Sequence, residues 1–232
     1  KAVEKALRKR GVEFLLNSSL LGYEKDENGQ LHIELEVNGV RERRTTEKIL
    51  VAVGREANIS DLGLENTAIE IEDGKIVTNE FFQTKESHIY AIGDCKTGME
   101  LAHVAAIEGM TAVEHMANLA SYPLDDRKIP MCIYSYPEVG SIGLTEEAAE
   151  KQGYELKVSR FPFLANGKAL IKGEENGFIK LIVDAKTDDI LGIHILGLQA
   201  TDMISEGALA KTLDASSWEL SKTIRPHPSL AE

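Results

Sequence analysis

The chain has 232 residues, of which 43% are hydrophobic, enough for one or two domains with an apolar core. Its 26 lysines and arginines against 38 aspartates and glutamates give a formal net charge of −12. This charge disfavours nucleic acid and anionic membranes as partners, because both bind positively charged surfaces. No apolar run approaches the length that spans a bilayer. We therefore expect a globular chain that binds neither nucleic acid nor a membrane.

The first residues include neither an initiator Met nor the apolar stretch of a signal peptide. Only two cysteines, Cys95 and Cys132, are present, 37 positions apart, so the sequence holds no short pair that could form a redox disulfide. For each cysteine the ordinary interpretation is a small buried thiol in a reducing compartment. We expect a cytoplasmic fragment without thiol chemistry of its own, and no metal site.

The beginning of the chain predicts a helix, a strand and a β-meander. Residues 1–10 alternate charge on a helical period and stop at Gly11, and residues 12–16 predict a strand. Four segments of alternating hydrophobicity follow, at residues 19–24, 31–37, 40–46 and 48–53. Asn-Gly pairs lie between the first three of these segments, which is a strong signal for hairpins.

Residues 87–94 (SHIYAIGD) predict a buried strand that ends in Gly-Asp, ahead of a helical pattern that begins near Leu101. The arrangement is typical of a turn that faces a ligand. Gly93 lets a ligand approach the backbone, and Asp94 can accept hydrogen bonds from sugar-like hydroxyls. The following helix presents free N–H groups at its positive end.

The remaining residues predict an α+β domain built on an antiparallel sheet. Residues 121–130 are charged and contain two prolines, as is typical of a linker. Strands are expected within residues 131–143, broken at 136–138, and at 178–183 and 190–196 as a hairpin. Helices are expected after an N-cap at Thr145, over residues 201–213, and after a capping box that begins at Ser216.

A histidine lies between two prolines at residues 226–228, and Glu232 follows it five positions later. Proline fixes its own φ and biases the preceding residue towards extended conformations, so His227 cannot lie inside a helix. A carboxylate that accepts the Nδ1 proton would fix the tautomer and leave Nε2 free to exchange a proton. His227 and Glu232 are therefore a candidate acid/base pair. The alternative is a loop histidine at a tight turn beside a solvated charge.

Taken together, these segments resemble the flavin-dependent pyridine nucleotide-disulfide oxidoreductases, most closely the dihydrolipoyl dehydrogenase branch. Besides residues 87–94, the resemblance is carried by residues 49–55 (ILVAVGR), 100–103 (ELAH), 136–140 (YPEVG), 161–169 (FPFLANGKA), 191–197 (LGIHILG) and 227–232 (HPSLAE). It implies an α/β plus α+β fold, the C-terminal part of a flavoprotein with two dinucleotide folds.

The resemblance also implies a division into three parts. Residues 1–56 would be the C-terminal part of an NAD-binding domain, residues 57–125 a central FAD-contacting segment, and residues 126–232 a dimerisation domain truncated at its C-terminus. In the family, the catalytic acid/base histidine matches His227, and the glutamate that orients it matches Glu232. The family also implies a cis peptide bond before Pro228.

The cofactors implied by the resemblance are FAD and NAD, and seven residues would contact them: Asp94, Glu100, Leu101, Ala102 and His103 for FAD, and Leu20 and Gly54 for NAD. Asp94 would hold the ribitol chain, and main-chain N–H groups of residues 100–103 would face the pyrimidine edge of the flavin. The backbone near Leu20 and Gly54 would make peripheral contacts on the nicotinamide side. The chain departs from the family at Glu100 and Val104, where the family commonly has Met and Lys.

In the intact parent, the resemblance implies oxidation of a protein-bound dihydrolipoyl group, with electrons passing through a cysteine pair and FAD to NAD. The implied partners are a second copy, whose flavin His227 would serve, and the lipoyl-bearing acyltransferase of a 2-oxo acid or acetoin dehydrogenase complex. The 232 residues hold no Gly-x-Gly-x-x-Gly loop, so we expect no activity from them alone. Two alternatives stay open: a non-catalytic dimerisation and assembly module, and the glutathione-reductase-like branch, which residues 161–169 disfavour.

Overall fold

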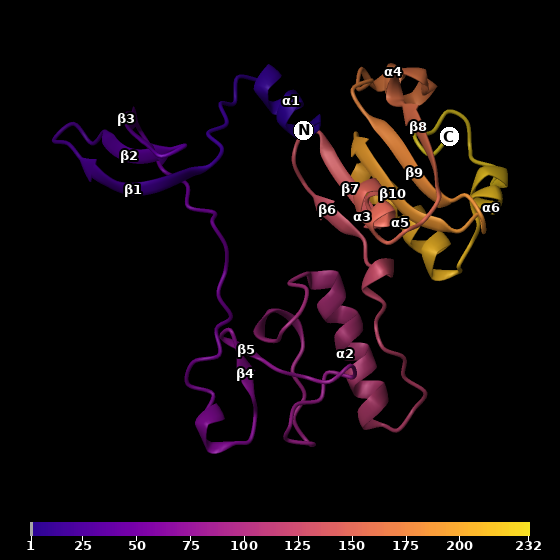
Figure 1. Cartoon of the computed structure of the whole chain (residues 1–232), viewed down its shortest axis with the longest axis horizontal. Helices are drawn as coiled ribbons and strands as arrows, with labels where there is room; N and C mark the ends of the chain where they lie inside the picture. Colours follow the sequence, from indigo (N-terminus) through magenta and orange to yellow (C-terminus); the bar gives the residue numbers. More distant parts are fainter. Residues whose placement is uncertain (1) are drawn as a thin grey trace. The chain divides into compact units, whose positions relative to one another are not determined.

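The computed structural model describes residues 2–232 (Figure 1), and the chain divides into two compact units with their boundary in the sequence between Arg55 and Glu56. Both units combine helices with antiparallel strands, so the mixed fold class expected from the sequence is confirmed. None of the described helices is long and apolar enough to cross a membrane.

The first unit consists of a short helix and a three-stranded antiparallel sheet with the order β1-β2-β3. Its elements are α1 (Ala2–Lys9), β1 (Ser18–Lys25), β2 (Leu31–Val37) and β3 (Val40–Thr46). The two hairpin turns contain residues with positive φ, among them Gly29 at +83° and Asn38 at +51°. Glycine and asparagine adopt this conformation at little cost, which is why the two Asn-Gly pairs fix the turns. The predicted meander is confirmed.

Two strands predicted in the first unit are wrong. Residues 12–16 and 48–53 are irregular, and apolar side chains in them are exposed, including Leu50 at 91% and Val53 at 93%. An apolar run becomes a strand only when another strand pairs with its N–H and C=O groups. Among the described residues, no strand pairs with either segment.

The second unit begins with a region of short elements around one long helix. These elements are η1 (Leu64–Asn66), β4 (Ile71–Glu72), β5 (Lys75–Ile76), η2 (Gly93–Cys95) and α2 (Ala102–Met116). The strand predicted over residues 87–94 is wrong, because the segment makes only an isolated bridge between Gln83 and Tyr90 before it enters η2. Ala91 and Gly93 are buried, but Ile92 between them is 39% exposed, so the predicted burial holds only in part.

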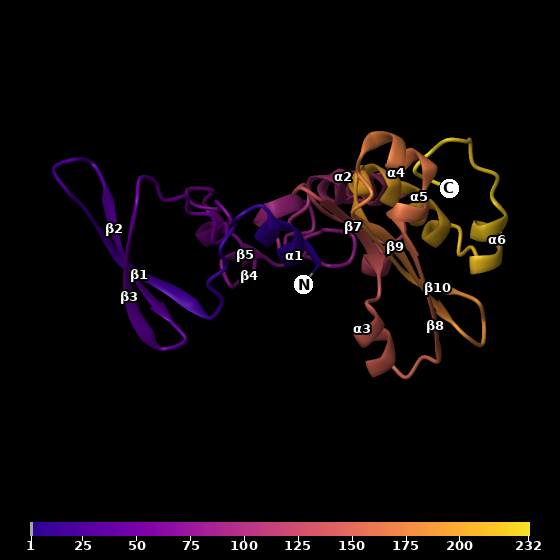
Figure 2. The same cartoon turned by 90° about the horizontal axis from the view of Figure 1, so that it is seen from above.

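The rest of the second unit is built on a five-stranded antiparallel sheet with the order β6-β7-β10-β9-β8 (Figure 2). The strands are β6 (Met131–Ile133), β7 (Glu138–Gly143), β8 (Leu156–Pro162), β9 (Phe178–Asp184) and β10 (Ile190–Gly197). The expected antiparallel sheet is therefore confirmed, whereas β8 had not been predicted. The predicted linker at residues 121–130, which precedes β6, contains one turn of 3-10 helix, η3 (Asp126–Lys128).

Helix α5 (Ala200–Thr212) packs on β7 and β10 and closes the main core of this sheet. Ile142, Ile193 and Ile204 are at most 5% exposed there. The approach is close: a Cβ on Gly140 would lie 2.3 Å from the carbonyl oxygen of Ala200. Glycine at position 140 therefore lets the first turn of α5 lie against β7.

Three short α-helices and one 3-10 helix complete the unit: α3 (Glu146–Lys151), η4 (Phe163–Ala165), α4 (Gly167–Lys172) and α6 (Ser217–Lys222). The side chain of Thr145 accepts a hydrogen bond from the N–H of Ala148, and Ser216 and Glu219 form a capping box. Both predicted caps are confirmed. Helix α4 had not been predicted, and its N-cap is Asn166, whose side chain accepts a hydrogen bond from the N–H of Ala169.

Candidate functional site

The predicted acid/base pair lies in the irregular segment after α6. The Nδ1 atom of His227 lies 2.8 Å from Oε1 of Glu232, and the N–H of Ser229 donates to Oε2 of the same carboxylate at 2.9 Å. The His227–Pro228 peptide bond is cis, as expected. The imidazole is 79% exposed, and because Nδ1 faces Glu232, Nε2 is the atom that can exchange a proton with a substrate.

The environment of Glu232 favours its ionised form. The backbone N–H of Ser229, followed by the imidazole of His227, lowers the pKa of Glu232 below its usual range. An ionised carboxylate accepts the Nδ1 proton and stabilises a positive charge on the ring. The arrangement therefore favours the tautomer with the proton on Nδ1 and leaves Nε2 able to act as a general base.

Two anchors hold the segment on either side of the histidine. Before it, Arg225 forms an ion pair with Glu206 on α5 and donates to the carbonyl oxygen of Leu220 at 3.1 Å. After it, Leu230 is 8% exposed and belongs to the main core. Asn166 also donates to the carbonyl oxygen of Ser229 at 3.1 Å. The sequence had not marked Arg225 or Asn166 as site residues, although Asn166 lies within the distinctive segment 161–169.

The predicted ligand-facing turn is formed by η2. Gly93 has a φ of +71°, and a Cβ there would lie 3.4 Å from the Cβ of Ala105 on α2. The buried N–H of Gly93 donates to Oε2 of Glu108 at 2.7 Å. Asp94 follows with an exposed side chain. Glycine reaches this conformation at low cost, and the turn packs against α2 with Asp94 directly after Gly93.

The first turn of α2 presents main-chain donors rather than side-chain ones. Leu101 is the N-cap, with extended φ and ψ and no side-chain cap, and its carbonyl oxygen accepts the N–H of Ala105. The N–H groups of Ala102, His103 and Val104 precede the first helical hydrogen bond and suit an anionic or electron-rich group.

Two side chains at this end of α2 have other partners. The Nε2 atom of His103 lies 2.9 Å from the carbonyl oxygen of Pro130, so this ring nitrogen is engaged within the protein. Glu100 forms an ion pair with Lys75, which offsets the negative charge that the sequence places beside the turn. A left-handed glycine, an exposed carboxylate and a row of helix-end N–H groups fit a dinucleotide.

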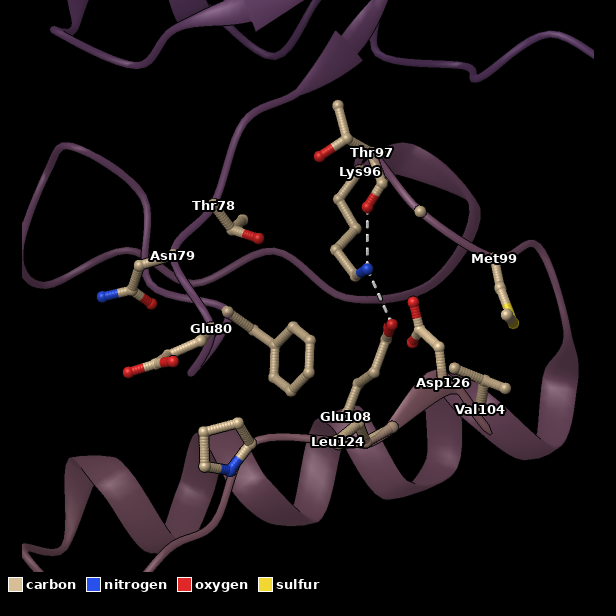
Figure 3. Close-up of a pocket in the computed structure, with 13 residues that line it drawn as sticks. Thr78, Asn79, Glu80, Lys96, Thr97, Met99, Val104, Glu108, Leu124 and Asp126 are labelled. Atoms are coloured by element: carbon tan, nitrogen blue, oxygen red, sulfur yellow. Dashed lines mark hydrogen bonds and ion pairs between the residues drawn. The ribbon is translucent and has the colours of Figure 1, made fainter. Parts of the chain in front are cut away.

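A buried ion pair lies behind the turn, and the sequence had not marked it. Nζ of Lys96 lies 2.7 Å from Oε1 of Glu108, and the side chains are 6% and 2% exposed (Figure 3). The pair lines a pocket of about 330 Å³. One signal was available: Glu108 lies on the same face of α2 as the buried residues Val104 and Ala112, four positions away on either side.

The two residues predicted for NAD belong to the first unit, whereas the other seven predicted site residues belong to the second. Leu20 lies in β1 opposite Leu35 and is 49% exposed. Gly54 lies in the irregular segment after β3 with a φ of +141°. Within the second unit, the predicted residues form two groups, one at η2 and the start of α2 and one at residues 227–232.

In the second unit, an antiparallel sheet domain with helices follows a Gly-Asp turn and a helix whose N–H groups could face a nucleotide. Residues 1–109 match the family model described as pyridine nucleotide-disulphide oxidoreductase, and residues 129–232 match that family's dimerisation domain. The chain therefore belongs to the pyridine nucleotide-disulphide oxidoreductase family.

Curated relatives of the chain are dihydrolipoyl dehydrogenases. The protein of Bacillus subtilis is 50% identical over 233 residues, covering 100% of this chain and 49% of the relative. The mitochondrial protein of Canis lupus familiaris is 39% identical over 235 residues, covering 100% and 46%. The chain thus spans about half the length of the curated relatives it matches.

Solved structures show the same fold. LpdA of Mycobacterium tuberculosis has a TM-score of 0.91 at 23% identity, over 99% of this chain and 49% of that one. The HOCl-induced flavoprotein disulfide reductase RclA of Escherichia coli has a TM-score of 0.90 at 24% identity, over 100% and 52%.

Proposed function

We propose that this chain is part of an FAD-dependent dihydrolipoyl dehydrogenase that oxidises a protein-bound dihydrolipoyl group and passes electrons through a redox disulfide and FAD to NAD. The observation that carries the proposal is the 2.8 Å contact between His227 and Glu232 on an anchored segment. The 50% identity to a dihydrolipoyl dehydrogenase supports this interpretation of the contact. The alternative, a non-catalytic assembly module, does not explain why the imidazole of His227 is oriented by Glu232.

The role of His227 is to take a thiol proton from the substrate. Its Nε2 accepts the proton of one dihydrolipoyl S–H group, and the thiolate that remains is the species that attacks a disulfide sulfur. The thiolate forms a mixed disulfide with one sulfur of the redox disulfide, the other sulfur leaves as a thiolate, and the proton stays on the ring. Glu232 holds Nδ1 and offsets the charge of the imidazolium.

The residues at η2 and α2 would hold FAD. Asp94 would accept hydrogen bonds from ribitol hydroxyls, and the main chain at Glu100, Leu101, Ala102 and His103 would face the pyrimidine edge. FAD, when bound, supplies a two-electron acceptor that passes the electrons to NAD. The main chain near Leu20 and Gly54 would contact NAD at its nicotinamide side.

The proposal includes an assembly. Residues 1–56, 57–125 and 126–232 would serve as the end of the NAD domain, the FAD-contacting segment and the dimerisation domain. The dimerisation-domain match supports a homodimer, in which His227 of one subunit would serve the flavin and disulfide of the other. A lipoyl-bearing acyltransferase of a 2-oxo acid or acetoin dehydrogenase complex would deliver the substrate in the cytoplasm.

The test is stopped-flow reduction of the flavin by dihydrolipoamide in the full-length protein that contains this chain. His227→Gln should lower the rate by about 100-fold or more, as expected for loss of a general base, with flavin and dimer retained. His32→Gln, in the sheet of the first unit, is the control and should leave the rate unchanged. An unchanged rate in His227→Gln would exclude the histidine as the base.

The same preparation separates the other two functions. A colourless, stable dimer that binds no flavin would support the assembly module. Reduction of the flavin by a reduced pyridine nucleotide, followed by reduction of glutathione disulfide rather than of a lipoyl disulfide, would support the glutathione-reductase-like branch.

A further inference from the structure

Lys96 and Glu108 form a salt bridge of 2.7 Å with side chains 6% and 2% exposed. Burial of two charges is costly, and it is tolerated where each charge is paired and its other hydrogen-bonding positions are filled. The proposed reaction uses neither side chain. A role for the pair has to come from what the two residues contact.

Both oxygens of Glu108 reach the segment that carries Asp94. Oε2 accepts the N–H of Gly93 at 2.7 Å, just before Asp94, and Oε1 contacts Nζ of Lys96, just after Cys95. Nζ also donates to the carbonyl oxygen of Thr97 at 2.8 Å (Figure 3). One carboxylate on α2 therefore holds the backbone before Asp94 directly and the backbone after it through the side chain of Lys96.

The turn requires such support from outside itself. Gly93 is in the left-handed region, at a φ of +71°, and the segment before it is not held in a sheet. Its N–H is buried, and a buried N–H without an acceptor is destabilising. Lys96 makes a carboxylate acceptable at this depth, and its Nζ also lies 5.1 Å from the centroid of the Phe82 ring.

We propose that Glu108 is a positioning residue that holds the turn at Gly93 and Asp94 in its flavin-binding geometry, and that Lys96 supplies the buried cation which its carboxylate needs. This rests on the proposed function, since it assigns the turn to FAD. Glu108 does not touch the cofactor; it acts through the backbone of Gly93. Its acceptor oxygen, rather than its charge, is the feature that fixes the turn.

Two double variants of the full-length protein separate the acceptor from the charge. Lys96→Met with Glu108→Gln removes both charges and keeps an oxygen that can accept the N–H of Gly93. Lys96→Met with Glu108→Leu removes both charges and the acceptor. The matched control is Lys180→Met with Glu146→Gln, which removes an ion pair between α3 and β9.

The measurement is the dissociation constant of FAD from each apoprotein, by titration of flavin fluorescence, with dimer mass and the unfolding transition checked alongside. The Gln double variant and the control should stay within about threefold of the parental value, and the Leu double variant should bind about tenfold or more weakly. Rescue by Gln over Leu is the signature of positioning. Equal affinities of the two double variants would overturn the role of Glu108.

A second readout needs no Leu variant. Hydrogen exchange at the amide of Gly93 should be slow in the parental protein and in the Gln double variant. Exchange at Gly93 as fast as at the exposed Gly98 would overturn the proposal. A parental protein that binds no FAD would overturn both this inference and the proposed function, whereas equal double variants beside a flavin-bound parental protein would overturn this inference alone.

Discussion

The carboxylate of Glu232 joins the imidazole of His227 to the main chain of its own segment. One oxygen lies 2.8 Å from Nδ1, and the other accepts the N–H of Ser229 at 2.9 Å. A carboxylate held at both oxygens cannot rotate away from the ring. The orientation of His227 is therefore set by the six residues 227–232, independently of any ligand.

Replacement of Glu232 by Gln should lower flavin reduction by dihydrolipoamide by about tenfold or more, but by less than His227→Gln. The amide oxygen can still accept a hydrogen bond from Nδ1, yet it brings no charge to stabilise the imidazolium. Stopped-flow reduction at a fixed substrate concentration checks this. A rate equal to the parental one would show that the charge of Glu232 has no part in proton transfer.

The same variant should reveal a pH dependence. Since the folded pKa of Glu232 lies below its unfolded value, the carboxylate stabilises the protein above the ordinary glutamate range, and this contribution is lost as the pH falls through the lowered pKa. Thermal unfolding of the parental protein and of Glu232→Gln from about pH 7 to about pH 3 should show a difference that shrinks with acidification. A difference that grows instead would contradict the sign.

Arg225 should stabilise the segment that carries the histidine. Arg225→Met removes the ion pair with Glu206 and the hydrogen bond to the carbonyl oxygen of Leu220, and should cost about 1–3 kcal/mol. Hydrogen exchange over residues 225–232 should accelerate. Arg127→Met, which removes an ion pair of an arginine 70% exposed, is the control and should change little.

His194 should make the sheet domain sensitive to acid. The pKa of His194 is lowered, chiefly because the ring is buried. Its Nε2 atom lies 3.0 Å from the carbonyl oxygen of Leu144. The folded state therefore resists protonation, and stability should fall as the pH drops from about 6.5 towards the lowered pKa. In His194→Gln, the free energy of unfolding should depend less steeply on pH over that range. An equally steep dependence on pH in the variant would exclude His194 as its source.

Gly140→Ala should destabilise the sheet domain by about 2–4 kcal/mol. The new Cβ would lie 2.3 Å from the carbonyl oxygen of Ala200 and 2.9 Å from the Cβ of Ile204, so α5 would have to move off β7. Chemical denaturation measures the loss. Gly167→Ala, where nothing lies within 4 Å of the added Cβ, is the matched control and should be close to neutral.

Elements fixed by local chemistry were predictable from the sequence, and elements fixed by distant partners were not. The Asn-Gly turns placed the meander, and the caps at Thr145 and Ser216 placed two helices. By contrast, residues 48–53 carry the pattern of a strand, yet they have no pairing partner among the described residues. β8 was missed because its alternation is weak, and all its residues after Leu156 are exposed.

The candidate site divides in the same way. His227 and Glu232 are five residues apart in one segment that two prolines stiffen, so spacing made them a candidate pair. The resemblance to the family decided between this pair and a loop histidine beside a solvated charge. Lys96 and Glu108 come from a turn and a helix, and no local rule brings them together. The sequence shows that Glu108, an acidic residue on the apolar face of α2, requires a partner. It does not show which residue that partner is.

The C-terminal segment is anchored by Arg225, which pairs with Glu206 on α5, and by Leu230 in the core. Under the proposed function, these anchors restrict how His227 can meet its substrate. An exposed ring on a backbone tied down at both ends cannot swing out to search for a thiol. In the proposed reaction, the substrate thiol must therefore travel to the ring. A lipoyl group on a shorter or stiffer carrier should then encounter the ring more slowly, with the proton transfer itself unaltered.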